Sequence, residues 1–363
     1  MASIDKRPDG RYRARWREYP GGPQRSKHFD RKIDAENHLV KTQHDLLTGA
    51  YIDPKKARTT VEEYYEVWRP RQPWRPSTRA TVESTFDNHV IPTFGDRPLV
   101  SIRRGDLESW AAGLELAPGT AGVTLQKFGT MLEAAVMDGL LASNPARGAR
   151  RPRVEFKPVT PLTLEELNAL RSAAPPWFRV AVTLGAAAGL RQGEATGLTI
   201  DRLNLLGRTL TVDRQLAISV TGELTFAPPK TPRSFRKVPL ADIALDQLAL
   251  HLRENGTGAD GLVLHEDGRP LHRQRFGRVW RSLRTQANLP TVRFHDTRHT
   301  FASTLLSGGV SVAAAADYLG HSPAMLLSTY AHLMPADHER ARAAVQAAFT
   351  PLAEDSLRTE AKT

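Results

Sequence analysis

A basic, proline-rich run at residues 149–161, ARRPRVEFKPVTP, divides this chain and limits what it can fold into. The run has no helical or strand period of apolar residues, so it predicts an extended linker rather than part of a core. Long segments lie on both sides of it in a chain of 363 residues. This length and this division together predict several domains instead of one.

The chain begins with a segment in which arginines alternate with other residues. Period two is typical of a β-strand and places residues of one parity on a single face. Residues 1–60 carry 14 basic and 8 acidic side chains, so we interpret the arginine face as a major-groove DNA contact. The alternative is an edge hairpin whose arginines lie in water. The arginines of this face are Arg11, Arg13, Arg15 and Arg17.

The same segment predicts a small N-terminal domain, residues 1–57. A proline–glycine turn leads to a second strand at 25–29. Asp34 has the residue type of an N-cap, and an apolar stripe continues to about residue 47. We therefore expect a small β-sheet backed by one helix.

Residues 58–148 predict an all-helical domain. Thr60 and Glu63 have the pattern of a capping box at its start, and helical periods follow with prolines between them. No group of residues in this domain has the pattern of a catalytic site. The helices are expected at 61–69, 77–91, 104–114 and 119–138.

The segment after the linker, residues 162–349, is also mostly helical. Two stretches of strand composition, 208–217 and 223–240, predict a small antiparallel β-meander. An amphipathic helix at 337–348 and a polar tail at 350–363 end the chain. The fold class is therefore α+β over several domains, with the strands in the minority.

Composition excludes several classes of site. The chain has no cysteine, which rules out disulfides, cysteine nucleophiles and thiolate metal sites. It has no P-loop, no signal-peptide pattern and no apolar run long enough to span a bilayer. A formal net charge of +11 makes nucleic acid the leading partner class. We expect a cytoplasmic, DNA-associated protein.

Arginines gather again in residues 269–298, which hold eight of them and one acidic residue. Forked guanidinium groups suit phosphate contacts. We assign Arg273, Arg275 and Arg278, on a predicted amphipathic helix, to DNA. A solvated basic face is the alternative.

The run HDTRH at residues 295–299 allows two chemical interpretations. His295 and His299 have the spacing of metal ligands on a helix, but a metalloprotease helix carries Glu where Asp296 stands. A cation, Arg298, also lies between them, so zinc is the weaker interpretation. His295 and Arg298 share a helical face and suit a phosphodiester, whose non-bridging oxygens gain charge during attack.

Four further candidates lie at helix ends and turns. Arg191 follows a Gly-Leu break, and Lys230 lies in a proline-flanked hairpin turn. His321 directly follows a glycine, and Tyr330 lies in the next predicted helix. Each has a simpler structural role when taken alone, so their order and spacing carry the argument.

Taken in order, these segments resemble the tyrosine recombinase (phage-type integrase) family. The resemblance covers roughly residues 160–350 and rests on GLRQGEATGL, PPKTPRSFRKVPL, HDTRHTFAS, LGHSPAM and STYAHL. The two preceding domains resemble, more weakly, the arm-type DNA-binding domain and the core-binding domain of longer members. The catalytic residues that the resemblance implies are Arg191, Lys230, His295, Arg298, His321 and Tyr330.

The resemblance also implies a reaction. Tyr330 attacks the scissile phosphate and leaves a 3′-phosphotyrosine and a free 5′-hydroxyl. Arg191, Arg298 and His321 would hold the non-bridging oxygens. His295 would manage the proton of the tyrosine, and Lys230 would protonate the leaving oxygen. One phosphodiester replaces another, so no ATP, metal or other cofactor is implied.

The implied function is a site-specific recombinase that integrates or excises a phage or other mobile element. Its partners would be double-stranded DNA carrying attachment sites, three further copies of the chain in a tetramer, and an accessory DNA-bending or directionality protein. The alternatives are resolvase-type or topoisomerase-like use of the same chemistry, and a non-catalytic DNA-binding regulator. The helix at 337–348 would dock either on its own domain or on a neighbouring protomer.

Overall fold

The structure is a computed structural model in which the chain forms two compact units, residues 1–155 and 156–363. The predicted helix at 337–348 lies mostly, and the tail at 350–363 wholly, outside the described residues. No helix in the described part of the chain is long and apolar enough to cross a membrane. The residues described are 2–19, 21–48, 51–155, 159–219, 222–333, 342–343 and 345–347.

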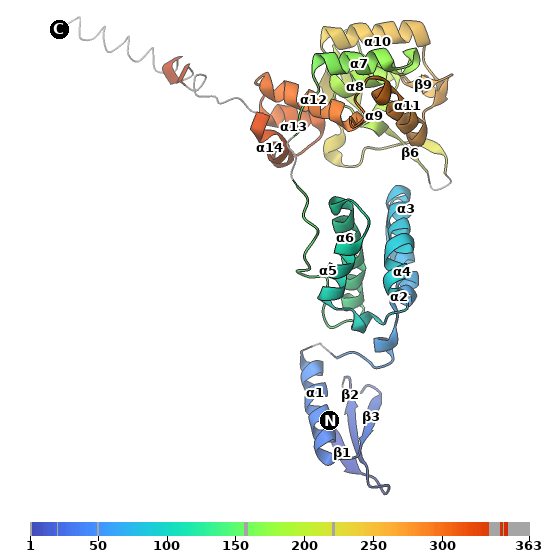
Figure 1. Cartoon of the computed structure of the whole chain (residues 1–363), viewed down its shortest axis with the longest axis vertical. Helices are drawn as coiled ribbons and strands as arrows, with labels where there is room; N and C mark the ends of the chain where they lie inside the picture. Colours follow the sequence, from blue (N-terminus) through green and yellow to red (C-terminus); the bar gives the residue numbers. More distant parts are fainter. Residues whose placement is uncertain are drawn as a thin grey trace, which may run out of the picture. The chain divides into compact units, whose positions relative to one another are not determined.

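A three-stranded antiparallel sheet and one helix open the first unit (Figure 1). Strand β2 pairs with β1 on one side and with β3 on the other, and helix α1 packs against β2. Ala14 and Trp16 of β2 are buried with Ala35 and Leu39 of α1. The arginines of β2 alternate with these buried residues, so the predicted period of two is confirmed. The elements are β1 (Ser3–Lys6), β2 (Tyr12–Arg17), β3 (Gln24–Phe29) and α1 (Lys32–Leu47).

Two details of this region differ from the prediction. Strand β1 was not predicted, because its four residues are too few to show a period. Asp34 is not the N-cap: α1 begins at Lys32, and Asp34 lies inside its first turn. Its carboxylate accepts hydrogen bonds from the Arg31 guanidinium at 2.8 and 2.9 Å, and a carboxylate in the first turn also complements the helix dipole.

The rest of the first unit is helical around its own apolar core. Thr60 and Glu63 form the predicted capping box at the start of α2. The chain does not break at Pro92, because a π-helical turn at Phe86–Val90 carries α3 directly into α4. The helices are α2 (Val61–Trp68), α3 (Pro76–Thr85), α4 (Ile91–Phe94), α5 (Arg104–Gly113) and α6 (Pro118–Met137).

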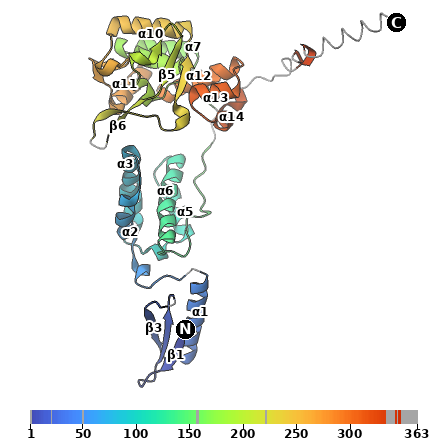
Figure 2. The ribbon, with the colours of Figure 1, turned by 180° about the vertical axis from the view of Figure 1, so that it is seen from behind.

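The second unit is mostly helical, and the views from front and back both show α12, α13 and α14 together at one end of it (Figure 2). Helices α8 and α12 pack closely, because Gly185 leaves room for the Thr297 side chain. The helices are α7 (Leu164–Ala173), α8 (Arg179–Ala186), α9 (Gln192–Thr196), α10 (Asp242–Asn255), α11 (Arg273–Gln286), α12 (Phe294–Ser307), α13 (Val312–Leu319) and α14 (Pro323–Tyr330).

The strands of this unit are antiparallel, as predicted, but they do not form one continuous meander. Strands β4, β5 and β8 form one sheet, whereas β6 and β7 form a separate hairpin between β5 and β8. Prolines 228, 229 and 232 lack the N–H that a ladder needs, so the chain leaves the hairpin there. The strands are β4 (Leu203–Asn204), β5 (Thr209–Val212), β6 (Gln215–Ile218), β7 (Leu224–Ala227), β8 (Arg236–Pro239), β9 (His265–Glu266) and β10 (Arg269–Pro270).

Candidate active site

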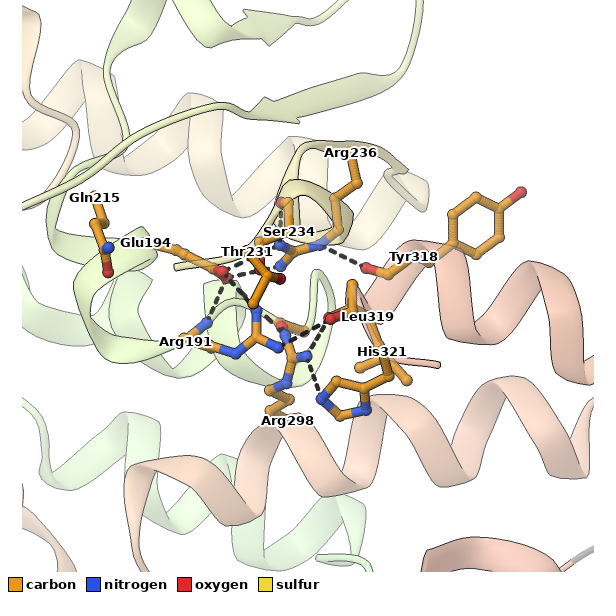
Figure 3. Close-up of polar contacts among 12 residues, drawn as sticks. Arg191, Glu194, Gln215, Thr231, Ser234, Arg236, Arg298, Tyr318, Leu319 and His321 are labelled. Carbon is orange, nitrogen blue, oxygen red and sulfur yellow. Dashed lines mark hydrogen bonds and ion pairs between the residues drawn. The ribbon is translucent and has the colours of Figure 1, made fainter. Parts of the chain in front are cut away.

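Three of the predicted catalytic residues meet in the second unit (Figure 3). Arg191 stands at the N-terminus of α9, Arg298 is in α12, and His321 follows the left-handed Gly320 that ends α13. Arg298 Nη2 and His321 Nε2 lie 2.9 Å apart. Arg191 Nη2 donates to the Gly320 carbonyl at 3.2 Å. The left-handed turn thus places His321 beside both arginines.

Arg298 is the largest fully buried side chain of the described residues, with 0% of its surface exposed. Its guanidinium donates to the backbone carbonyls of Gly189 and Leu319, which hold it in place. Burial, together with the positive charge of Arg191, lowers the pKa of Arg298 to about 9, so the group remains protonated at neutral pH. Its Nε has no hydrogen-bond partner among the described residues, so the group keeps an unused donor.

A buried carboxylate, Glu194, lies among the arginines and was not predicted. It accepts from Arg236 at 2.7 and 3.1 Å and from Arg191 at 2.8 Å, and it lies 4.0 Å from Arg298. Burial opposes the charge, but the hydrogen bonds and charges of these arginines outweigh it and lower the pKa of Glu194 to about 2. Three cations therefore face one anion, and the cluster keeps an excess of positive charge for a further anion.

The signal for Glu194 in the sequence was its place three residues after Arg191, which is the spacing of a capping box. The structure has this box, because the Glu194 carboxylate accepts the Arg191 backbone N–H at 2.9 Å. No local signal links Glu194 to Arg236, since 42 residues separate them.

His321 is neutral in this setting. Desolvation and then the positive charges of Arg298 and Arg191 lower the pKa of His321 to about 3. Since Arg298 can only donate, His321 Nε2 must accept, and the ring proton lies on Nδ1. That buried nitrogen has no partner in the described part of the chain, so His321 offers a free N–H donor.

Tyr330 ends α14 and is 1% exposed. Its hydroxyl lies 2.5 Å from Nδ1 of His299. Burial raises the pKa of Tyr330 to about 12, although the charge of Arg298 acts in the opposite direction. A neighbouring acceptor is therefore needed for the phenol to lose its proton near neutral pH.

His295 lies beside His299 in α12. The rings of His295 and His299 meet edge-on with centroids 4.7 Å apart, but the Tyr330 hydroxyl forms its hydrogen bond with His299. Desolvation and electrostatic interactions with His299 and Arg298 lower the pKa of His295 to about 4.

Within the described residues, no group of three or more His, Cys, Asp or Glu side chains is placed to hold a metal ion.

Lys230 is exposed on the connection from β7 to β8. It does not lie in a hairpin turn, as was predicted, because β6 and β7 pair from Gln215 with Ala227 to Ile218 with Leu224 and Lys230 follows β7. Close to it, the Thr231 and Ser234 hydroxyls are 3.0 Å apart. The described residues show no hydrogen bond from Lys230 to the other predicted catalytic residues.

The arginine face of the N-terminal sheet is partly neutralised within its own domain. Arg13 and Arg15 both pair with Asp5 at 2.8 Å, and the hydrogen bond from Arg13 leads in lowering the pKa of that carboxyl. Arg11 pairs with Asp30 at 3.3 Å. Arg17 donates to the Gly22 carbonyl. This face stays a predicted DNA contact.

The arginines of the 269–298 cluster do not share one surface. Arg273 and Arg278 are exposed on α11, whereas Arg275 donates to Glu266 at 2.8 Å. Arg293 pairs with Asp296 at 2.8 Å, and Arg298 is buried as described above. Arg273, Arg275 and Arg278 stay predicted DNA contacts.

The sequence matches two families of phage integrase domains and resembles several integrases. The family described as "Phage integrase family" matches residues 160–337, and the family described as "Phage integrase, N-terminal SAM-like domain" matches residues 60–114. A protein named as prophage phiRv2 integrase of Mycobacterium tuberculosis is 28% identical over 84% of both chains. The integrase of Mycobacterium phage D29 is 25% identical over the same shares.

Solved structures share the fold. The Tn1549 transposon integrase in complex with a circular intermediate DNA has a TM-score of 0.68 and 22% identity, covering 79% of this chain and 98% of that one. A lambda integrase tetramer bound to a Holliday junction has a TM-score of 0.57 and 19% identity, covering 89% of this chain and 94% of that one.

Proposed function

Because this chain belongs to the phage integrase family of tyrosine recombinases, we propose that it cuts and rejoins DNA through Tyr330 and the surrounding basic cluster. The protein is a site-specific recombinase of mobile elements. The observation that carries the proposal is the convergence of Arg191, Arg298 and His321 on one place, with unused donors on Arg298 and His321.

The first part of the mechanism is phosphate binding. Arg191, Arg236 and Arg298 face the single carboxylate of Glu194, so a phosphodiester brings the missing negative charge. In the transition state the non-bridging oxygens gain further charge, and donors that are already oriented stabilise it without rearrangement. His321 Nδ1–H adds a neutral donor to the guanidinium groups of Arg191 and Arg298.

The second part is the transfer itself. Tyr330 Oη forms a bond to phosphorus, and the bond from phosphorus to the 5′-oxygen of the DNA breaks. Lys230 is proposed to protonate that leaving oxygen, and its exposed position on a loop leaves it able to approach bound DNA. The resulting 3′-phosphotyrosine keeps the energy of the phosphodiester, so a second 5′-hydroxyl can reverse the step.

The partners follow from the reaction. The proposed substrate is double-stranded DNA with attachment sites, contacted also by the N-terminal arginine face and by α11. Exchange between two duplexes needs four cleavages, and the related lambda integrase has been solved as a tetramer on a Holliday junction, so we propose a tetramer here as well. An accessory DNA-bending or directionality protein is proposed as a further partner.

The test is a covalent trapping experiment. Purified protein is incubated in EDTA with nicked suicide substrates carrying the DNA that flanks its gene, then denatured with SDS. We expect a covalent protein–DNA band that maps to Tyr330 and is absent in Tyr330→Phe, with DNA affinity unchanged within about twofold. Binding without any covalent band on all substrates would instead support a non-catalytic DNA-binding regulator.

A further inference from the structure

We propose that His299 is the base that takes the proton from Tyr330 when the tyrosine attacks DNA. The inference rests on the proposed function, and no pattern in the sequence favours this histidine over His295 for the role. It makes His299 a catalytic residue, because its ring touches the reacting oxygen.

The first support is geometry. His299 lies in the middle of α12 and Tyr330 at the end of α14, and His299 Nδ1 is 2.5 Å from Tyr330 Oη. The ring centroids are 5.7 Å apart. With Tyr330 1% exposed, bulk water does not reach the hydroxyl freely. The imidazole nitrogen is therefore the acceptor already in place.

The second support is the protonation state of the ring. Proton transfer requires the tautomer in which His299 Nδ1 accepts from the phenol O–H and the ring proton lies on Nε2. Burial lowers the pKa of His299 and keeps it neutral at neutral pH. The charged and titratable groups around it are Asp296, which favours the imidazolium, and Arg293, Arg298, His295 and Tyr330.

The third support is the weakness of the alternative. His295 is turned with its ring edge-on to His299 and makes no hydrogen bond to Tyr330 among the described residues. The positive charges of three arginines, 298, 191 and 293, act on His295, whereas only two of them, 293 and 298, act on His299. His299 has Asp296 nearby to offset part of the new charge.

The step balances. The Tyr330 O–H bond breaks and its proton passes to His299 Nδ1, while Oη bonds to phosphorus. The bond from phosphorus to the 5′-oxygen breaks, and that oxygen takes a proton from Lys230. In the rejoining step a 5′-hydroxyl gives its proton to Lys230 and its oxygen bonds to phosphorus. The bond from phosphorus to Tyr330 Oη breaks, and His299 returns its proton to that oxygen.

The experiment compares variants of the full chain on a suicide DNA substrate. His299→Asn keeps an acceptor oxygen close to the position of Nδ1 but cannot take the proton, and His299→Gln is the second variant if the first loses its fold. His295→Asn is the matched control from the same helix. We expect His299→Asn to slow covalent adduct formation by about 10²–10³-fold and to bind DNA within about twofold of the unchanged protein. His295→Asn should slow it by less.

Two chemical substitutions separate a base from a purely structural residue. Replacing Tyr330 by a fluorinated tyrosine, whose phenol is more acidic, should reduce the defect of His299→Asn by at least about tenfold, since less help is needed. A substrate with sulfur in place of the bridging 5′-oxygen should rescue Lys230→Met, because a thiolate leaves without a proton, and should not rescue His299→Asn.

Three results would overturn the proposal. His299→Asn could cleave within about threefold of the unchanged protein, His295→Asn could show the larger defect, or the sulfur substrate could rescue His299→Asn fully. If the unchanged protein forms no adduct at all, the proposed function fails and this inference fails with it. If the unchanged protein forms the adduct and His299→Asn forms it within about threefold of the same rate, the inference alone is refuted.

Discussion

Replacing Glu194 by Gln removes one negative charge from among three arginines, of which Arg236 and Arg298 are buried, and keeps the shape of the side chain. In the unchanged protein the carboxylate is 4% exposed, and its pKa is lowered from 4.5 to about 2. A shift of that size corresponds to about 3 kcal/mol of stabilisation at neutral pH. We therefore expect Glu194→Gln to lower the free energy of unfolding of the second unit by about 3 kcal/mol.

The pH dependence gives the sign of the effect. Because the pKa of Glu194 is lower in the folded state, its stabilisation is complete above the unfolded pKa and is lost as the pH falls toward 2. The difference between the two proteins should thus shrink to about half near pH 3. It should not change between pH 6 and pH 8, where the carboxylate is ionised in both states.

The assay is urea unfolding of the full chain at a series of pH values. Glu266→Gln is the matched control. Glu266 also pairs with an arginine, Arg275, but both side chains are partly exposed, Glu266 at 28% and Arg275 at 43%. This variant should therefore lose less than about 1 kcal/mol of unfolding free energy. Added sulfate should recover more stability in Glu194→Gln than in the unchanged protein, since an anion can replace the lost charge. A variant as stable as the unchanged protein at pH 7 would refute this account of the cluster.

Four further outcomes are expected. Gly185→Ala should destabilise the second unit by about 1–3 kcal/mol in thermal unfolding, because a methyl group there overlaps the Thr297 side chain; a silent change would contradict the close α8–α12 contact. Thr60→Ala should lower stability by about 1 kcal/mol in urea unfolding through loss of the capping box. The rate of covalent adduct formation should be unchanged when EDTA removes divalent metal ions, because guanidinium and imidazole donors stabilise the charge on the phosphate oxygens. The double change Arg13→Gln and Arg15→Gln should weaken DNA binding and reduce the slope of log affinity against log salt by about 1 to 2, measured by fluorescence anisotropy; an unchanged slope would place the N-terminal face away from DNA.

Local patterns were enough for much of the fold. The capping box at Thr60, the period of two that buries Ala14 and Trp16, and the left-handed glycine before His321 are all set by residues within a few positions of one another. Such signals fail where a short element has no period to show, as in β1. Local patterns also do not determine which strands pair with one another. The prediction therefore did not separate the hairpin of β6 and β7 from the sheet of β4, β5 and β8.

The sequence by itself singled out the residues that are proposed for the chemistry, because Arg191, Arg298, His321 and Tyr330 stand in motifs whose order is specific. It did not determine which groups they touch. His295 and His299 lie on one helix. Only the position of α14 relative to α12 decides that Tyr330 forms its hydrogen bond with His299. Glu194 and Arg236 are 42 residues apart, and only the tertiary fold, in which β8 packs on α13, brings their side chains within 2.7 Å. Hydrogen bonds act over a few ångströms, whereas spacing along the chain carries no information on distances that long-range packing sets.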